Sequence, residues 1–124
     1  MSLTVYVVDD SPLVRQRIET LLGRIDGARI VGQAECADEA IARIPALLPQ
    51  VVILDLRLAR GTGFDVLRAL RERAPQVEVY LLSNFASPAY RRTAEQLGAR
   101  GYFDKTHEFA QLMDLLAQRA YAEV

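Results

Sequence analysis

Short apolar runs in four separate parts of the chain each end in residues that can take part in phosphoryl chemistry. Asp9 and Asp10 follow the first run, Asp55 the second, Ser83 the third and Lys105 the fourth. If these runs are neighbouring parallel strands, all five side chains meet at one edge of a sheet. Three crowded carboxylates repel one another, so such a cluster calls for a divalent cation. With the cation bound, one carboxylate can act as the nucleophile that takes a phosphoryl group.

The elements that would position these residues follow from the apolar pattern, which predicts five rounds of strand and helix. The strand-like runs are short and apolar without alternation, which is typical of strands buried on both faces of a parallel sheet. The predicted strands cover residues 4–8, 29–34, 51–54, 77–82 and 101–103. Apolar residues at helical spacing follow each strand, and each predicted helix has about ten to fourteen residues.

The alternation predicts an α/β fold with a doubly wound, parallel, five-stranded sheet. Right-handed crossovers place the helices on both faces of such a sheet. The flavodoxin-like (βα)5 strand order 2-1-3-4-5 puts the first and third strands side by side. Asp9, Asp10 and Asp55 then share one crevice, with Ser83 and Lys105 on the adjoining strands. No repeat or linker interrupts the pattern, so a single domain over residues 1–124 is expected.

Turn and cap residues indicate where some of these elements begin. Ser11 is predicted to cap the first helix, and Asp38 the second. Pro45 falls inside the second helix and leaves its end undefined. Gly61 and Gly63 are expected to serve the turn geometry of the loop after the third strand. They lack the spacing of a phosphate-cradling loop.

The composition is ordinary for a globular domain, with 124 residues, 51% hydrophobic, 25% charged and a net charge of −1. The charge excludes a global field that would draw the chain to nucleic acid or to an anionic membrane. No apolar stretch reaches about 18 residues and no signal peptide is present, so we expect a cytoplasmic location without membrane contact. Cys36 and His107 are the only residues of their types, which leaves no basis for a disulfide or a Cys- or His-rich metal site.

Taken together, the polar residues at the strand ends resemble those of the receiver domain of bacterial two-component response regulators. The family has an acidic pair, an Asp, a Ser and a Lys after strands one, three, four and five. Here an aromatic residue, Tyr102, also stands three residues before the Lys. The resemblance extends from Val5 to about Ala117. Each motif alone is common, and only their combination is specific.

The resemblance implies that the chain is a phosphoacceptor switch. Asp55 would accept a phosphoryl group from the phosphohistidine of a histidine kinase or a histidine phosphotransfer protein. Mg²⁺ would be held by Asp9, Asp10 and Asp55, and by the backbone carbonyl of Arg57. Lys105 would pair with Asp55 and later with the phosphoryl oxygens. The chain would catalyse its own phosphorylation and slow dephosphorylation, with no turnover of a metabolite.

The same resemblance implies how the switch is read. Ser83 would hydrogen-bond a phosphoryl oxygen and move toward it, and Tyr102, the aromatic switch, would turn inward into the vacated space. The surface of the fourth helix, fifth strand and fifth helix would then change. A partner protein, an output domain or a second copy forming a homodimer would recognise that surface.

Three positions depart from the family pattern. Thr106 follows Lys105, where most receivers have a Pro joined by a cis peptide bond. A cis bond before Thr costs about 2.5–4 kcal/mol, so a trans loop and a shifted lysine are expected. Asn84 stands where the family has a small residue, and its amide would narrow the route to the acceptor. The third position is Arg57, whose positively charged side chain would either contact the phosphoryl group or fold over the site.

Two other functions use parts of this residue set. Phosphatases of the haloacid-dehalogenase type also use an Asp nucleophile, Mg²⁺ and a Lys. They place a second Asp two residues after the nucleophile, where this chain has Arg57, and no cap domain fits in the remaining length. A degenerate receiver would act only as an interaction module, which Thr106 and Asn84 allow and the complete acidic set opposes. No basic recognition helix is apparent, so the chain either works alone or belongs to a longer regulator.

Overall fold

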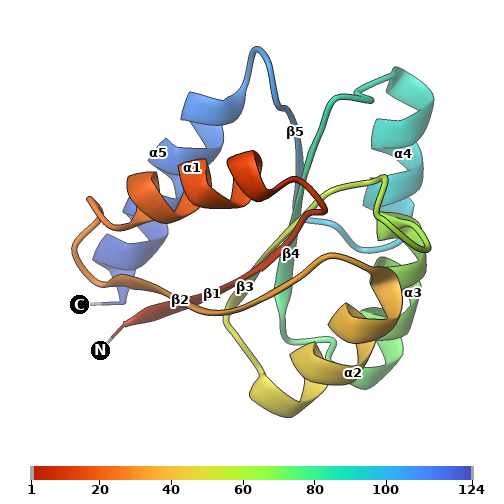
Figure 1. The fold of residues 1–124 in the computed structure, drawn as a ribbon, viewed down its shortest axis with the longest axis horizontal. Helices are drawn as coiled ribbons and strands as arrows, with labels where there is room; N and C mark the ends of the chain where they lie inside the picture. The colour runs from red at the N-terminus through yellow and green to blue at the C-terminus, as the bar shows by residue number, and fades with distance from the viewer. Residues whose placement is uncertain (1, 124) are drawn as a thin grey trace.

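The computed structural model describes residues 2–123, in which five parallel strands form one sheet between two layers of helices (Figure 1). The strands are β1 (Leu3–Val8), β2 (Ala28–Ala34), β3 (Val51–Leu54), β4 (Glu78–Ser83) and β5 (Gly101–Asp104). The helices are α1 (Pro12–Leu22), α2 (Ala37–Leu47), α3 (Gly63–Arg73), α4 (Pro88–Gln96) and α5 (Phe109–Ala122). The strand order is β2-β1-β3-β4-β5, so the predicted flavodoxin-like arrangement is confirmed.

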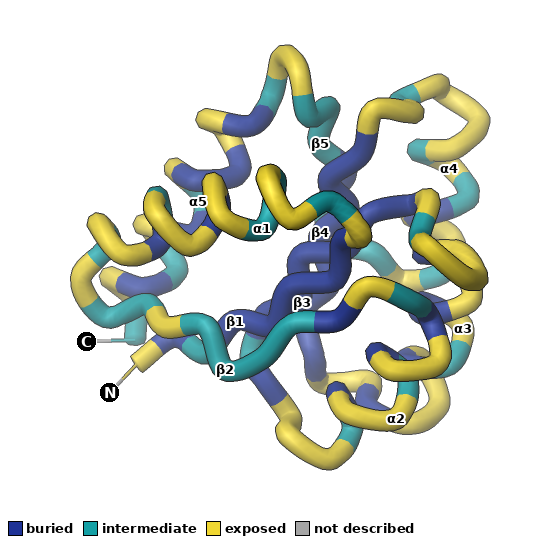
Figure 2. Tube along the Cα trace, in the orientation of Figure 1, coloured by how far each residue is buried: buried dark blue, intermediate teal, exposed yellow. Residues whose placement is uncertain are grey.

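Two apolar clusters cover the two faces of the sheet. On one face, Ile18 of α1 and Leu112 and Leu116 of α5 pack against the central strands. On the other face, α2, α3 and α4 pack against the same strands, with Ile44 and Leu67 among the buried residues. β3 and β4 are buried along their whole length, whereas β2 at the edge is mostly half-buried (Figure 2). This double coverage explains why the central strands appear in the sequence as continuous apolar runs.

The helix starts agree with the sequence signals except at α2. α1 begins behind Ser11, which caps it as predicted. α2 begins at Ala37, and the side chain of the preceding Cys36 makes no capping bond. The prediction that Asp38 caps this helix is therefore wrong, since Asp38 lies within the first turn. The helix starts earlier because the Ala37 N–H already has an acceptor, the Arg60 carbonyl at 2.9 Å.

Among residues 2–123, no helix has the length and apolar character needed to cross a bilayer.

A partly buried ion pair fixes α5 to the end of the sheet where β4 begins. Glu78, the first residue of β4, accepts a hydrogen bond from Arg119 Nε at 3.0 Å. The Tyr80 hydroxyl donates to Glu78 at 3.2 Å, and Arg119 also donates to Glu123 at 2.9 Å. The Glu78 and Arg119 side chains are 11% and 28% exposed. The Arg119 hydrogen bond, with smaller help from Tyr80, holds the pKa of Glu78 below its ordinary value.

We expect Glu78→Gln to destabilise the protein at neutral pH and to have little effect in acid. Because the folded pKa of Glu78 is lowered, its stabilisation is complete above the ordinary value of 4.5 and is lost as the pH falls through the folded pKa. Urea unfolding at pH 7 should show a loss of about 2 kcal/mol, which should shrink at an acid pH well below 4.5. Asp114→Asn, on the exposed face of α5, is the control. A loss that is the same at both pH values would contradict the expectation.

Candidate functional site

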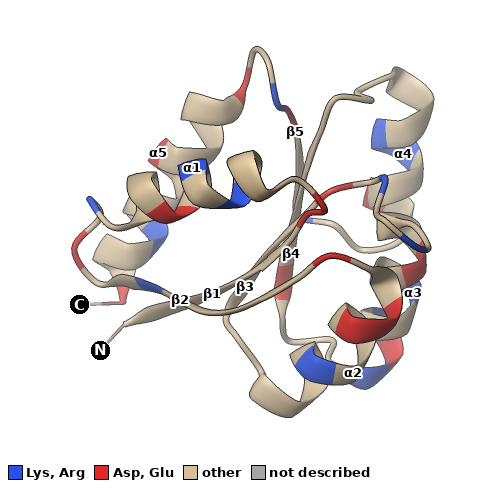
Figure 3. Ribbon diagram, viewed as in Figure 1, with Lys and Arg blue, Asp and Glu red and all other residues tan. Residues whose placement is uncertain are grey.

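Three aspartates from the ends of β1 and β3 converge on one point. Asp9 and Asp10 follow β1, and Asp55 follows β3. The two strands are paired with Val8 opposite Leu54, so their ends are level and the acidic segments lie side by side (Figure 3). One carboxylate oxygen of each aspartate lies within 4.8 Å of the others. Asp9 and Asp55 are only 2% and 7% exposed, whereas Asp10 is exposed. The structure thus brings together the three aspartates that the sequence singled out.

Lys105 reaches into this cluster from the loop after β5. Its Nζ lies 2.8 Å from Asp9 Oδ2 and 2.8 Å from Asp55 Oδ2, and its side chain is 10% exposed. The Lys105 N–H donates to the Ser83 carbonyl at 3.0 Å, which continues the pairing of β4 and β5 by one residue. The peptide bond to Thr106 is trans, as expected, like every other described peptide bond. The lysine reaches both carboxylates with the trans bond in place.

The electrostatics of the cluster reflect burial and crowding. Burial raises the pKa of Asp55 above its ordinary value, Lys105 offsets only part of this rise, and the charge of Asp9 adds to it. Burial alone would lower the pKa of Lys105, but its hydrogen bonds with Asp55 and Asp9 outweigh this and the pKa is raised. The ammonium is therefore charged at neutral pH. One ammonium cannot balance three carboxylates, so a further cation would be stabilised here.

Gly63 allows the loop that carries the acceptor candidate to pack against the start of α3. A Cβ at position 63 would lie 2.4 Å from the backbone oxygen of Asp55 and 3.1 Å from the Cα of Leu56. The Gly63 N–H donates to the Leu56 carbonyl at 2.7 Å. Thr62 and Asp65 form a capping box around the same turn, with bonds of 3.2 and 2.9 Å. The position of Asp55 therefore depends on a close backbone contact that only glycine permits.

Ser83 and Tyr102 both bind the backbone of Phe85, in the loop between β4 and α4. The buried Ser83 hydroxyl accepts from the Phe85 N–H at 3.1 Å. The Tyr102 hydroxyl donates to the Phe85 carbonyl, and Tyr102 is 8% exposed. Tyr102 is thus already turned inward in this structure, whereas the sequence analysis expected an inward turn only on phosphorylation. An outward position of Tyr102 before phosphorylation, and the movement of Ser83, stay predictions.

Arg91 of α4 links this region to the loop that carries Lys105, a contact that the sequence did not indicate. Its Nη1 donates to the Tyr102 carbonyl at 2.7 Å, and its Nη2 pairs with Glu108 Oε1 at 2.6 Å. The same Glu108 oxygen accepts from the Asp104 N–H at 2.9 Å. Arg91 therefore joins α4, β5 and the loop before α5.

Arg57 of the acceptor loop and Phe85 of the loop after β4 are both exposed and stack on each other. The guanidinium carbon of Arg57 lies 4.2 Å from the centroid of the Phe85 ring. The arginine thus packs on an aromatic side chain, an arrangement that stabilises a cation in water by about 0.5–1 kcal/mol. Asn84 is exposed between the buried strand end and Phe85.

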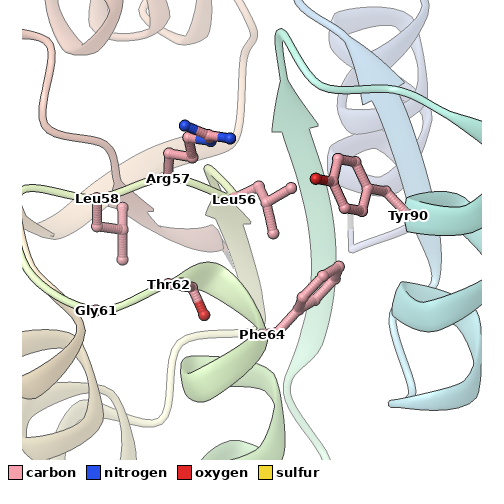
Figure 4. A pocket seen from close by; sticks show the side chains of 7 residues that line it. All are labelled: Leu56, Arg57, Leu58, Gly61, Thr62, Phe64 and Tyr90. Carbon is pink, nitrogen blue, oxygen red and sulfur yellow. The ribbon is translucent and has the colours of Figure 1, made fainter.

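An apolar hollow of about 410 Å³ lies between the acceptor loop and α4 (Figure 4). The rings of Phe64 and Tyr90, with centroids 6.2 Å apart, line one side, and Leu58 lies across from them. Leu56, the residue after the acceptor candidate, lies between them. The lining contains no carboxylate and no imidazole, so the hollow does not extend the acidic cluster.

Comparison with known proteins gives a consistent result. A family model described as the response regulator receiver domain matches residues 5–117. The DNA-binding transcriptional activator DevR/DosR of Mycobacterium tuberculosis is 38% identical over 101 residues, which cover 82% of this chain and 46% of that protein. The response regulator GacA of Pseudomonas aeruginosa is 29% identical over 116 residues, which cover 94% of this chain and 54% of that protein. The chain thus spans about half the length of these relatives.

A solved structure shows the same likeness. The signal receiver domain of the response regulator NarL from Mycobacterium tuberculosis has a TM-score of 0.87 and 30% identity to this chain, with 97% of each chain covered. The response regulator domain of Thermotoga maritima CheB has a TM-score of 0.85 at 23% identity, a likeness of fold.

Proposed function

Because the chain belongs to the response regulator receiver family, we propose that it is a phosphoacceptor switch of a two-component system in which Asp55 takes the phosphoryl group. One observation carries the proposal above the others. The Lys105 ammonium lies 2.8 Å from both Asp9 and Asp55 within a cluster of three carboxylates. The phosphoryl donor would be the phosphohistidine of a histidine kinase or of a histidine phosphotransfer protein, in the cytoplasm.

The residues of the cluster fit a Mg²⁺ ion. Mg²⁺ prefers oxygen ligands, keeps several waters and is bound in proteins by one or two carboxylates with additional oxygen donors. Asp9, Asp10 and Asp55 supply three converging carboxylates, and the backbone carbonyl of Arg57 would be a further ligand. When bound, the ion would neutralise negative charge on the transferred group and favour the ionised form of Asp55.

The proposed reaction is an in-line displacement at phosphorus. A carboxylate oxygen of Asp55 attacks the phosphorus, the bond between phosphorus and the imidazole nitrogen breaks, and its electron pair stays on the ring. The phosphohistidine ring carries a proton on its other nitrogen, so the products are an acyl phosphate on Asp55 and a neutral imidazole. Lys105, which holds Asp55 Oδ2 in this structure, would bond the phosphoryl oxygens as charge builds on them. The Ser83 hydroxyl would donate a hydrogen bond to a further phosphoryl oxygen.

The contacts of Phe85 suggest how the site and the partner surface are connected. Ser83 holds the N–H of Phe85, and Tyr102 holds its carbonyl. A shift of Ser83 toward a phosphoryl group would therefore move the loop to which Tyr102 is bonded, and the surface of α4, β5 and α5 would change with it. A partner protein, a second copy or an output domain of a longer regulator would recognise the change. We assign no nucleic-acid binding to residues 1–124 themselves.

Reaction with acetyl phosphate tests this proposal. We expect intact-mass spectrometry to show one added phosphoryl group in the presence of Mg²⁺ and none after chelation with EDTA. Failure to take up phosphate or beryllofluoride with Mg²⁺ present would overturn the proposal in favour of an interaction module without phosphoryl chemistry. Release of phosphate from p-nitrophenyl phosphate over many turnovers would instead indicate a phosphatase.

A further inference from the structure

Arg15 of α1 ties two loops together beside the acidic cluster. Its Nη1 donates to the backbone carbonyl of Asp9 at 2.7 Å, and its Nη2 pairs with Glu35 Oε1 at 3.1 Å. The Arg15 side chain is only 16% exposed, although Glu35 is 61% exposed. The guanidinium therefore connects the turn between β1 and α1 to the loop between β2 and α2.

The carbonyl that Arg15 holds belongs to the peptide unit between Asp9 and Asp10. A peptide unit is planar, so a fixed Asp9 oxygen also fixes the N–H and the Cα of Asp10. The remaining polar groups of Asp9 are engaged as well, since Oδ1 accepts from the Ser11 N–H at 2.9 Å and Oδ2 contacts Lys105 at 2.8 Å. Asp10 is exposed, so the direction of its carboxylate depends on how its backbone is held.

We propose that Arg15 is a positioning residue for the magnesium pocket, where it sets the direction in which the Asp10 carboxylate enters. This inference rests on the proposed function, because it concerns the Mg²⁺ ligands named there. Arg15 touches neither the ion nor the phosphoryl group and acts through the Asp9 carbonyl. A guanidinium suits this task because its planar fork bonds two acceptors at fixed angles, whereas a lysine ammonium is a flexible point charge. Glu35 holds the second side of the fork.

Arg15→Lys tests the inference at constant charge. We expect its Mg²⁺ affinity, measured by isothermal titration calorimetry, to fall about tenfold, as for other residues that orient metal ligands from outside the coordination shell. Its reaction rate with acetyl phosphate should fall at low Mg²⁺ and return to within about twofold of wild type at saturating Mg²⁺. A purely structural defect would lower the rate at every Mg²⁺ concentration.

Arg17→Lys is the matched control on the same helix. The guanidinium of Arg17 lies over the Phe109 ring at 3.9 Å, so its substitution keeps the charge and leaves the Asp9 turn intact. Its Mg²⁺ affinity should equal that of wild type. Urea unfolding of each variant without Mg²⁺ measures its free energy of unfolding, which shows whether the substitution has destabilised the fold.

A second pair of variants tests the other side of the fork. Glu35→Gln should weaken Mg²⁺ binding about threefold. Glu39→Gln is its control, because Glu39 lines the same surface hollow as Arg15 and Glu35 and its substitution makes the same charge change. The Mg²⁺ affinity of Glu39→Gln should equal that of wild type. Equal Mg²⁺ affinity of Arg15→Lys and wild type would overturn the inference and leave the proposed function standing. A wild-type protein that binds no Mg²⁺ would overturn both.

Discussion

Asp55→Asn is expected to abolish phosphorylation of the protein. The amide keeps the size of the side chain but is not a nucleophile, so the rate of adduct formation from acetyl phosphate should fall by at least about 1,000-fold. Folding should survive the change, because Lys105 keeps its contact with Asp9 at 2.8 Å and no buried charge is left unpaired. Burial raises the pKa of Asp55, so its ionised form costs stability at neutral pH and the neutral amide removes that cost. The unfolding free energy without Mg²⁺ should therefore be equal to or above that of wild type.

The control for this variant is Asp114→Asn, which makes the same chemical change on an exposed face of α5. It should react with acetyl phosphate at the rate of wild type. A stable phosphoryl adduct on Asp55→Asn, seen by intact mass and mapped by peptide sequencing, would refute the assignment of the acceptor. The neighbouring carboxylates Asp9 and Asp10 would then be the first candidates.

The second large effect is expected for Lys105→Gln. Without Mg²⁺ this variant leaves Asp9 and Asp55 facing each other with no cation between them, and both are buried. Loss of one partner of a buried ion pair costs about 3–5 kcal/mol, which urea unfolding at neutral pH would detect. Phosphorylation by acetyl phosphate at saturating Mg²⁺ should also slow about 100- to 1,000-fold, because the positive charge that would stabilise the phosphoryl oxygens is lost.

Magnesium should act more strongly on the Lys105→Gln variant than on the wild-type protein. A bound cation would supply part of the positive charge that the ammonium provided, so saturating Mg²⁺ should raise the melting temperature of the variant by more than that of wild type. Arg92→Gln removes one positive charge from an exposed site on α4 and should show neither effect. If Lys105→Gln were as stable as wild type without Mg²⁺, the contacts of Lys105 with Asp9 and Asp55 would contribute little to folding stability.

The fold and the acidic site could be predicted from the sequence because the sheet is buried on both faces. Each central strand then appears as an apolar run that stops where the chain leaves the core, and the residue at that stop lies at the functional edge. Asp55 after β3 and Lys105 after β5 were located in this way. With a trans bond before Thr106, Lys105 still contacts Asp9 and Asp55, and backbone pairing with β4 holds the start of its loop.

What the sequence could not predict depends on contacts between distant residues. Asp38 has the residue type of a helix cap, but the Arg60 carbonyl, from another loop, already satisfies the N–H that begins α2. The ion pairs of Arg91 and Arg15 have no signal in the sequence, because their partners Glu108 and Glu35 are 17 and 20 residues away along the chain. Tyr102 could be recognised by its place before the lysine, but residue type gives no side-chain direction.

Lys105 is the only lysine among the 124 residues, since the other 14 basic residues are arginines. Apart from the α-amino group, the chain therefore carries a single primary amine, and that amine lies between two aspartates. Reductive methylation with ¹³C-formaldehyde would give one side-chain resonance, free of overlap from other lysines. That resonance would report metal binding, phosphoryl transfer and pH at the pocket in a single spectrum. Because Lys105 is the only lysine, an acylating reagent would modify no other side-chain amine. Its rate of reaction would report how often the largely buried Lys105 side chain becomes accessible to solvent.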